Sequence, residues 1–271
     1  MSSYPWVAGI NALFALSYFV RIIKQKTMDF KKHIPNAITC CNLISGCIAI
    51  YAAMYGLPQT CLAFIIIGAI FDFFDGMSAR LLHVSSEIGK ELDSLADVVT
   101  FGVAPASLLF WFLKVAEYPA LLEPLRNFLP FSAFLIAAFS ALRLAKFNLD
   151  TRQTTSFIGL PTPANALFWG AFIASLDYSL AQYSLIVPII LIGIIGSCWM
   201  LVSEIPMFAL KFKHWRFKGN EIKYGFAAFS AATMLFGIVY GVCSNNENIV
   251  WTPICIIIPA YVIISVITRK K

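Results

Sequence analysis

Apolar residues form long runs along this chain, separated by short polar connections. Eight of the runs reach about 20 residues, the length that a helix needs to cross the hydrocarbon core of a bilayer. They lie near residues 36–55, 60–79, 89–113, 129–148, 161–180, 184–203, 224–243 and 249–267. They are too long, and alternate too little, to be strands of a membrane barrel. The pattern predicts an all-α integral membrane protein, a bundle of eight transmembrane helices.

A ninth apolar run lies near residues 6–23. It has neither a basic leader nor a small-residue cleavage site, which argues against a signal peptide. Two interpretations remain open. Residues 1–27 form an additional helix with its N-terminus outside, or Met28 is the natural start of the chain. In either case we expect residues 28–271 to form a single membrane domain.

The composition agrees with this picture and excludes other classes of protein. Apolar residues make up 59% of the chain and charged residues 13%, whereas a soluble domain has about half and about a quarter. The seven cysteines include no Cys-x-x-Cys pair and the three histidines are isolated, so we expect neither a disulfide framework nor a zinc site. A net charge of +6 on so apolar a chain is not typical of a nucleic-acid binder, and we expect no nucleic-acid partner.

The positions of the basic residues predict the orientation of the bundle. Eighteen of the 20 Lys and Arg residues lie on alternate connections, and only Lys114 and Arg126 lie on the others. Connections rich in Lys and Arg stay in the cytoplasm. We therefore expect a multi-pass protein of the cytoplasmic membrane whose C-terminus, and whose polar segments discussed next, face the cytoplasm.

Four of the 14 acidic residues form one compact pattern between the second and third runs. Asp72 and Asp75 are three residues apart, so they share one face of a helix, and Asp93 and Asp97 share a face of the next helix. Two helices joined by a short loop would point these carboxylates at a common space.

Such a group needs a partner, because one charged residue deep in a bilayer costs roughly 2.5–3.5 kcal/mol and like charges repel. Divalent cations are the natural partner, since Mg²⁺ prefers oxygen ligands and keeps positions open for water and phosphate. Four carboxylates can hold two such ions, an arrangement that clamps a phosphate group undergoing displacement.

Small residues accompany the acids. Gly76 and Ala79 lie on or beside the acidic face, where a larger side chain would block a bulky ligand, and Gly89 allows close approach one turn before Asp93. Arg80 adds a fixed positive charge suited to a phosphate. Any one of these residues could be a solvated helix end, but the whole pattern indicates a site.

The pattern Asp-x2-Asp-Gly-x2-Ala-Arg-x8-Gly-x3-Asp-x3-Asp, residues 72–97, resembles the signature of the CDP-alcohol phosphotransferases at every position. The resemblance implies a homodimeric membrane enzyme that uses Mg²⁺ or Mn²⁺, with residues 28–271 as its catalytic domain. It also implies that Asp72, Asp75, Asp93 and Asp97 are metal ligands, with Asp97 the general base. By the same resemblance, the CDP-lipid site is lined by Gly76, Ala79, Arg80 and Gly89.

Segments that flank or overlap the signature resemble those of the family's phosphatidylserine synthases. They are residues 34–46, 89–105, 143–148 and 159–164, which extend the likeness over roughly residues 28–270. This implies transfer of a phosphatidyl group from CDP-diacylglycerol to L-serine within membrane lipid. The segment before Met28 departs from the family's pattern.

Two further groups of polar residues are candidates for substrate binding, but their spacing is less specific than that of the acids. Asn36, Thr39 and Asn42 share a helix face at the cytoplasmic entry of the first run and would bind the CDP-lipid, although helix capping explains Asn36 equally well. Arg143 or Lys146 would bind the carboxylate of the acceptor serine. Both are explained equally well as ordinary cytoplasmic basic residues.

Two other functions remain as alternatives. The first is the same chemistry on another acceptor, such as glycerol 3-phosphate or an inositol phosphate. A phosphorylated acceptor would favour a denser cluster of basic residues than the chain has after its fourth apolar run. The second is a cation transporter, whose sites usually lie near the midplane at the interface of repeats. No internal repeat is visible in this sequence.

Overall fold

The fold comes from a computed structural model, which describes residues 31, 33–150, 157–176, 183–208 and 220–268. The expected helix near residues 6–23, and the choice of Met28 as the start, lie outside the described residues.

The described chain is almost entirely helical. In order, its elements are α2 (His33–Met54), α3 (Pro58–Leu82), α4 (Glu87–Asp97), the π-helical segment η1 (Val98–Val103), α5 (Ala104–Val115), the 3-10 turns η2 (Glu123–Leu125) and η3 (Leu129–Ala133), α6 (Phe134–Leu149), β1 (Phe157–Ile158), α7 (Thr162–Ser175), α8 (Ile186–Val202), β2 (Pro206–Met207), α9 (Glu221–Cys243), the 3-10 turn η5 (Glu247–Trp251) and α10 (Thr252–Ile267). The two strands form one short antiparallel pair. The expected all-α membrane protein is confirmed.

Six helical segments among the described residues are long and apolar enough to cross a membrane, rather than the eight expected. Two expected spans are shorter: α7 has 14 residues and α8 has 17. α7 begins directly after Pro161 and ends at Ser175, inside the apolar run expected at 161–180. The count of eight spans is therefore not confirmed.

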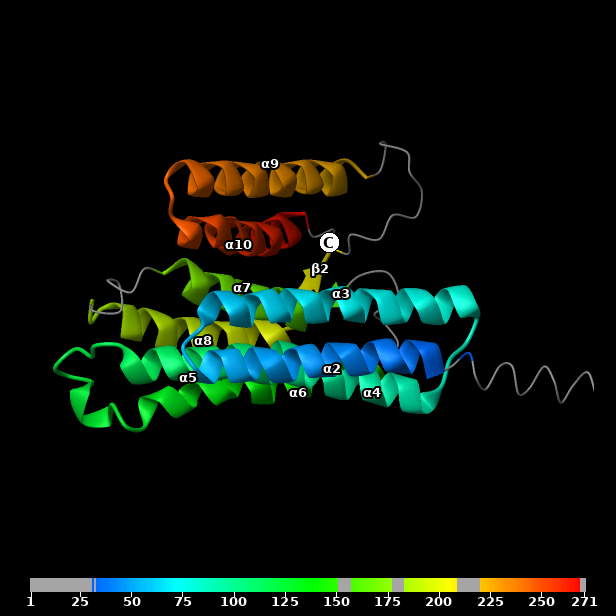
Figure 1. The fold of residues 1–271 in the computed structure, drawn as a ribbon, viewed down its shortest axis with the longest axis horizontal. Helices are drawn as coiled ribbons and strands as arrows, with labels where there is room; N and C mark the ends of the chain where they lie inside the picture. Colours follow the sequence, from blue (N-terminus) through cyan, green and yellow to red (C-terminus); the bar gives the residue numbers. More distant parts are fainter. Residues whose placement is uncertain (1–30, 32, 151–156, 177–182, 209–219, 269–271) are drawn as a thin grey trace, which may run out of the picture.

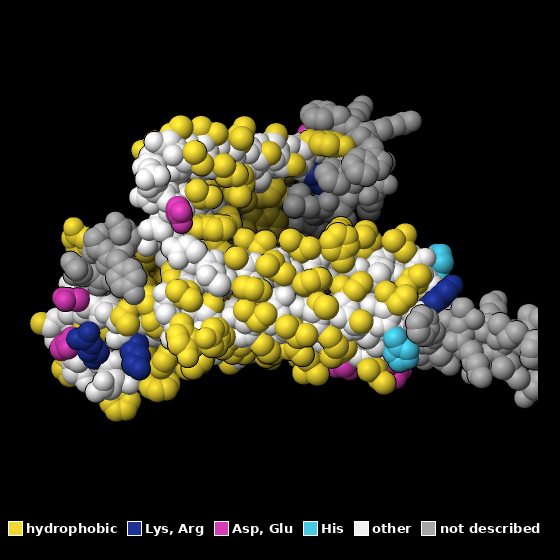
Figure 2. All heavy atoms as spheres, viewed as in Figure 1, with side chains coloured by type: hydrophobic (Ala, Val, Ile, Leu, Met, Phe, Trp, Pro, Cys, Tyr) yellow, Lys and Arg dark blue, Asp and Glu magenta, His cyan; other side chains and the backbone are white. Residues whose placement is uncertain are grey.

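The helices run roughly parallel to one another, and α9 and α10 form a pair beside the main bundle (Figure 1). This pair packs against the bundle mainly through α7. On the face that Figure 2 shows, apolar side chains cover the length of the bundle and charged side chains gather at its two ends. An apolar belt between charged ends is what a bilayer requires of a membrane protein.

The bundle's core lies around α5. Small residues of α2 allow α5 to approach closely, and large side chains of α7 and α8 close the other side. Representative members are Ala49, Ala53, Leu109, Trp169 and Ile190, all of them buried.

The turn between α3 and α4 brings the acidic residues to one end of the bundle. The first turn of α2, the last turn of α3 and the first turn of α4 all meet there (Figure 1). His83 ends α3 in the left-handed conformation, with φ 52°. Ser86 is the N-cap of α4, and its hydroxyl accepts a hydrogen bond from the backbone N–H of Gly89 at 2.9 Å. This capping fixes the reversal between the two helices.

Candidate active site

Three carboxylates converge at this end of the bundle. Oxygen atoms of Asp72, Asp75 and Asp93 all lie within 4.8 Å of one another. Asp72 and Asp75 project from one face of α3, and Asp93 projects from the facing turn of α4, as their spacing predicts. Three of the four acids that the sequence was expected to bring together thus meet in space.

Asp97 lies one turn further along α4, outside that group of three but within electrostatic reach of all its members. Its side chain is only 8% exposed. The amide of Asn42 on α2 donates a hydrogen bond to Oδ1 of Asp97 at 3.1 Å. Asp97 is therefore a deeper carboxylate held by one neutral donor.

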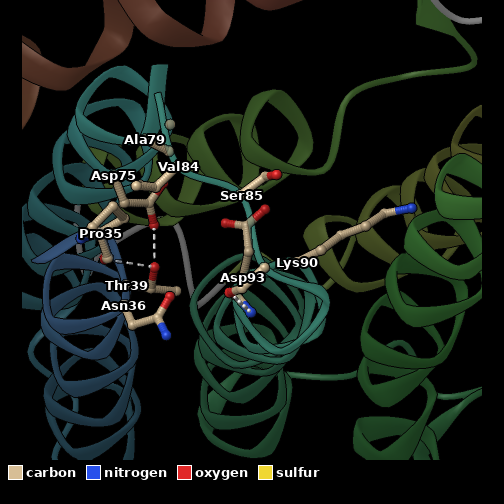
Figure 3. A pocket seen from close by; sticks show the side chains of 12 residues that line it. Pro35, Asn36, Thr39, Asp75, Ala79, Val84, Ser85, Lys90 and Asp93 are labelled. Atoms are coloured by element: carbon tan, nitrogen blue, oxygen red, sulfur yellow. Dashed lines mark hydrogen bonds between the residues drawn. The ribbon is translucent and has the colours of Figure 1, made fainter. Parts of the chain in front are cut away.

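Residues of α2 hold a second carboxylate in the same way. The hydroxyl of Thr39 donates to Oδ2 of Asp75 at 2.6 Å, and it also lies 3.1 Å from the carbonyl oxygen of Pro35 (Figure 3). Thr39 and Asn42 were expected to bind the CDP-lipid. In the structure both side chains donate hydrogen bonds to carboxylates, because their shared face of α2 packs against α3 and α4. Their binding to the CDP-lipid stays a prediction.

Thr100 is a buried residue of this region that sequence reasoning missed. It lies in η1, directly after α4, and its hydroxyl donates to the carbonyl oxygen of Asn42 at 3.0 Å. Gly46 lies opposite, and a Cβ built on it would collide with the Thr100 hydroxyl. Segments of π-helix occur often at functional sites. The contact fixes α2, which carries Thr39 and Asn42, against the helix that carries Asp97.

A cavity of about 260 Å³ opens beside the carboxylates. Figure 3 shows Asp75 and Asp93 reaching it from different helices, while the side chain of Lys90 extends away from it. The Lys90 ammonium donates instead to the carbonyl oxygen of Asn148 on α6, at 3.0 Å. The lining residues are Pro35, Asn36, Thr39, Asp75, Gly76, Ala79, Val84, Ser85, Ser86, Gly89, Lys90 and Asp93.

The two glycines of the pattern line this cavity for different reasons. A Cβ on Gly76 would meet no atom within 4 Å, so Gly76 opens onto free space. A Cβ on Gly89 would lie 2.9 Å from Oδ1 of Asn36 and 2.8 Å from Oγ of Ser86. Gly89 therefore lets α4 approach the start of α2.

Arg80 lies outside this lining. It is exposed and borders an adjoining depression, which shares Ala79, Val84 and Ser85 with the cavity. A phosphate that extended from the cavity over the end of α3 would approach its guanidinium.

Arg143 and Lys146 border a second, smaller cavity of about 50 Å³, at the ends of α6 and α8. Lys146 is exposed, whereas Arg143 is 6% exposed and lies within electrostatic reach of Asp97. Of the two expected acceptor residues, only Arg143 is thus linked to the carboxylates.

The group of carboxylates fits divalent cations. No Lys or Arg among the described residues forms an ion pair with any of the four Asp side chains. Oδ1 of Asp93 is buried and has no hydrogen-bond partner. Unpaired carboxylate oxygens at this separation are the donor set that hard divalent ions prefer.

Comparison with known proteins agrees with this site. A family model described as CDP-alcohol phosphatidyltransferase matches residues 32–202, nearly two thirds of the chain. The chain belongs to the CDP-alcohol phosphatidyltransferase family. This confirms the resemblance found in the signature, and the match spans α2 to α8 and the whole lining of the larger cavity.

This chain is similar to several proteins named CDP-diacylglycerol–serine O-phosphatidyltransferase. The protein of Bacillus subtilis is 39% identical over 189 residues, which cover 68% of this chain and 92% of that protein. The protein of Helicobacter pylori is 37% identical over 140 residues, covering 49% and 54%. The protein of Methanocaldococcus jannaschii is 37% identical over 139 residues, covering 51% and 59%. The chain thus spans little more than half of the last two relatives.

Proposed function

We propose that this protein transfers the phosphatidyl group of CDP-diacylglycerol to the hydroxyl of L-serine, giving phosphatidylserine and CMP. The observation that carries the proposal is the convergence of Asp72, Asp75 and Asp93, from the family signature, on a cavity at one end of an apolar bundle. The names of the similar bacterial and archaeal proteins support serine as the acceptor.

In this proposal Asp72, Asp75, Asp93 and Asp97 together hold two Mg²⁺ or Mn²⁺ ions. When bound, such ions neutralise a diphosphate and stabilise the charge that develops as CMP leaves. The charge of the four side chains and the unpartnered Oδ1 of Asp93 support this assignment.

The cavity receives the CDP group of the lipid donor. Gly76, Ala79 and Gly89 leave room for it, and Asn36 offers a polar contact at its rim. Arg80 lies where it can approach a phosphate from the adjoining depression. The acyl chains remain in the surrounding lipid, beside the apolar outer faces of α2 and α3.

Asp97 acts as the general base. Because the Asn42 amide binds only Oδ1 among the described contacts, Oδ2 is left to accept a proton. The proton of the serine hydroxyl passes to Asp97, and the serine oxygen bonds to the phosphorus that carries the diacylglycerol. The bond from that phosphorus to the CMP oxygen breaks, and CMP leaves.

Arg143 supplies the positive charge for the serine carboxylate, with Lys146 near the mouth of the smaller cavity. We further propose that the site faces the cytoplasm, as the distribution of basic residues indicates, and that the protein is a homodimer in the cell membrane. Residues 28–271 form one catalytic domain in this account.

Release of CMP by the purified protein tests the proposal. With CDP-diacylglycerol and Mg²⁺ or Mn²⁺, we expect CMP release that requires L-serine and that stops when EDTA removes the divalent ion. Glycerol 3-phosphate and inositol phosphate serve as competing acceptors. Release of CMP with either of these but not with serine, or serine-dependent release unaffected by EDTA, would contradict the proposal.

A further inference from the structure

Buried polar atoms without hydrogen-bond partners gather on two helices beyond the carboxylates. Among the described residues, Ser140 Oγ and Arg143 Nε on α6, and Thr162 Oγ1 and both amide atoms of Asn165 on α7, have none. Most buried polar groups in proteins are paired, so each exception calls for a reason. One bound ligand that contacts all five atoms would explain why none of them has a partner within the protein.

The residues of α6 face η1, the segment that directly follows Asp97. A Cβ built on Gly102 of η1 would lie 3.2 Å from the Cβ of Ser140, so Ser140 points at η1. Arg143 follows three residues later on the same face of α6. Its guanidinium interacts electrostatically with Asp97, the last residue of α4 before η1 begins.

The residues of α7 approach the same segment from another side. Thr162 and Asn165 are three residues apart in the first turn of α7, and each is 1% exposed. They belong to the buried face of α7, which also carries Trp169. Trp169 and Phe101 of η1 are members of the same hydrophobic core. Both α6 and α7 pack against η1, so the two polar faces flank one segment.

The combined chemistry matches a small zwitterion. A carboxylate would accept hydrogen bonds from the Arg143 guanidinium, the Thr162 hydroxyl and the Asn165 amide NH₂, and the N-terminal end of α7 favours negative charge. An ammonium group would donate to Oδ1 of Asn165, which needs a donor. A phosphorylated polyol could offer that oxygen only an uncharged hydroxyl donor.

We propose that Thr162 and Asn165 of α7, with Ser140 and Arg143 of α6, recognise the α-amino-acid group of the acceptor and place its hydroxyl beside Asp97. This inference rests on the proposed function and adds to it the residues that determine acceptor specificity. Arg143 supplies the charge, and the two α7 residues distinguish an amino acid from other alcohols.

The test is steady-state CMP release by Asn165→Leu and Thr162→Val with L-serine and CDP-diacylglycerol varied separately. Loss of a hydrogen bond to a charged group predicts a KM for serine raised about tenfold or more in Asn165→Leu, with the KM for CDP-diacylglycerol unchanged. Thr162→Val is expected to shift the KM for serine in the same direction. The thermal midpoint should stay equal or rise, because both changes remove unsatisfied polar atoms.

Thr233→Val is the matched control, since its exposed hydroxyl donates to the carbonyl oxygen of Phe229 within α9, at 2.8 Å. It should leave both KM values unchanged. The inference is overturned if both α7 variants keep a normal KM for serine, or if both KM values rise together with a lower thermal midpoint, which indicates a structural role. If the unaltered protein releases no CMP with serine, the proposed function itself fails; an active protein with normal α7 variants overturns this inference alone.

Discussion

Asp97 lies apart from the other three carboxylates of the signature. Asp72, Asp75 and Asp93 meet within 4.8 Å, whereas Asp97 lies a turn deeper and accepts a hydrogen bond from the Asn42 amide. Arg143, buried on α6, borders the second cavity. Because it stands outside the group of three, Asp97 is the carboxylate to which we assign the role of general base.

Asp97→Asn keeps the size of the side chain and removes its ability to accept a proton. A positioned general base contributes about 10²–10⁴-fold to rate, so we expect kcat for serine-dependent CMP release to fall within that range. The thermal midpoint should be retained, because a buried charge disappears while the shape is kept. Glu123→Gln, an exposed change in η2, is the control. Near-normal turnover by Asp97→Asn would rule out its role as base.

At the scale of single residues, spacing predicted the acids well and their partners poorly. Periods of three and four residues correctly predicted that Asp72, Asp75 and Asp93 meet, because a helix fixes which positions share a face. Asp97, expected in the same group, lies one turn further along α4. The contacts from Thr39 to Asp75 and from Asn42 to Asp97 depend on the axial register of α2 relative to α3 and α4. That register is decided by packing between helices and cannot be read from the sequence of α2 alone.

At the scale of elements, the packing of α2 against η1 positions the site. Gly46 of α2 faces Thr100 of η1, and the Thr100 hydroxyl bonds to the carbonyl of Asn42 one turn earlier. A side chain at position 46 would separate these two elements. The third apolar run was expected as one regular helix, and its π-helical segment was missed because such segments arise from tertiary contacts.

Gly46→Ala should therefore destabilise the protein. Its Cβ would overlap the Thr100 hydroxyl and lie 2.9 Å from the Thr100 Cα, which is backbone and cannot rotate away. Overpacking of this kind costs about 1–3 kcal/mol, measured as a lower free energy of unfolding in detergent. Gly196→Ala on α8 is the matched control, since its Cβ would meet no atom within 4 Å. Equal stability of the two variants would show that α2 and η1 are not tightly packed here.

At the scale of the whole molecule, apolar runs predicted the fold class and most helix positions. Six of the expected spans have counterparts of sufficient length, and α7 and α8 are the two short ones. Hydropathy alone cannot predict that α7 and α8 are shorter than their apolar runs, because it does not show where within a run a helix begins or ends. The pairing of β1 with β2, and the place of α10 against α7, join segments too far apart in sequence for local patterns to reveal.

The arrangement of the whole bundle also explains why the acids are tolerated. The carboxylates lie toward the end where α2 begins, α3 ends and α4 begins, and charged side chains of the visible face gather at the ends (Figures 1 and 2). Ions can reach that end from water, while the apolar belt remains in lipid.

Binding of Mn²⁺ to the purified protein, measured by titration calorimetry, tests the central claim most directly. We expect the unaltered protein to bind Mn²⁺, and Asp93→Asn to bind it at least about tenfold more weakly, because the change removes a metal-ligating charge worth ~1.4 kcal/mol or more. Glu123→Gln, at the other end of the bundle, should bind as the unaltered protein does. Equal Mn²⁺ affinity in Asp93→Asn and the unaltered protein, or no binding by either, would contradict the account.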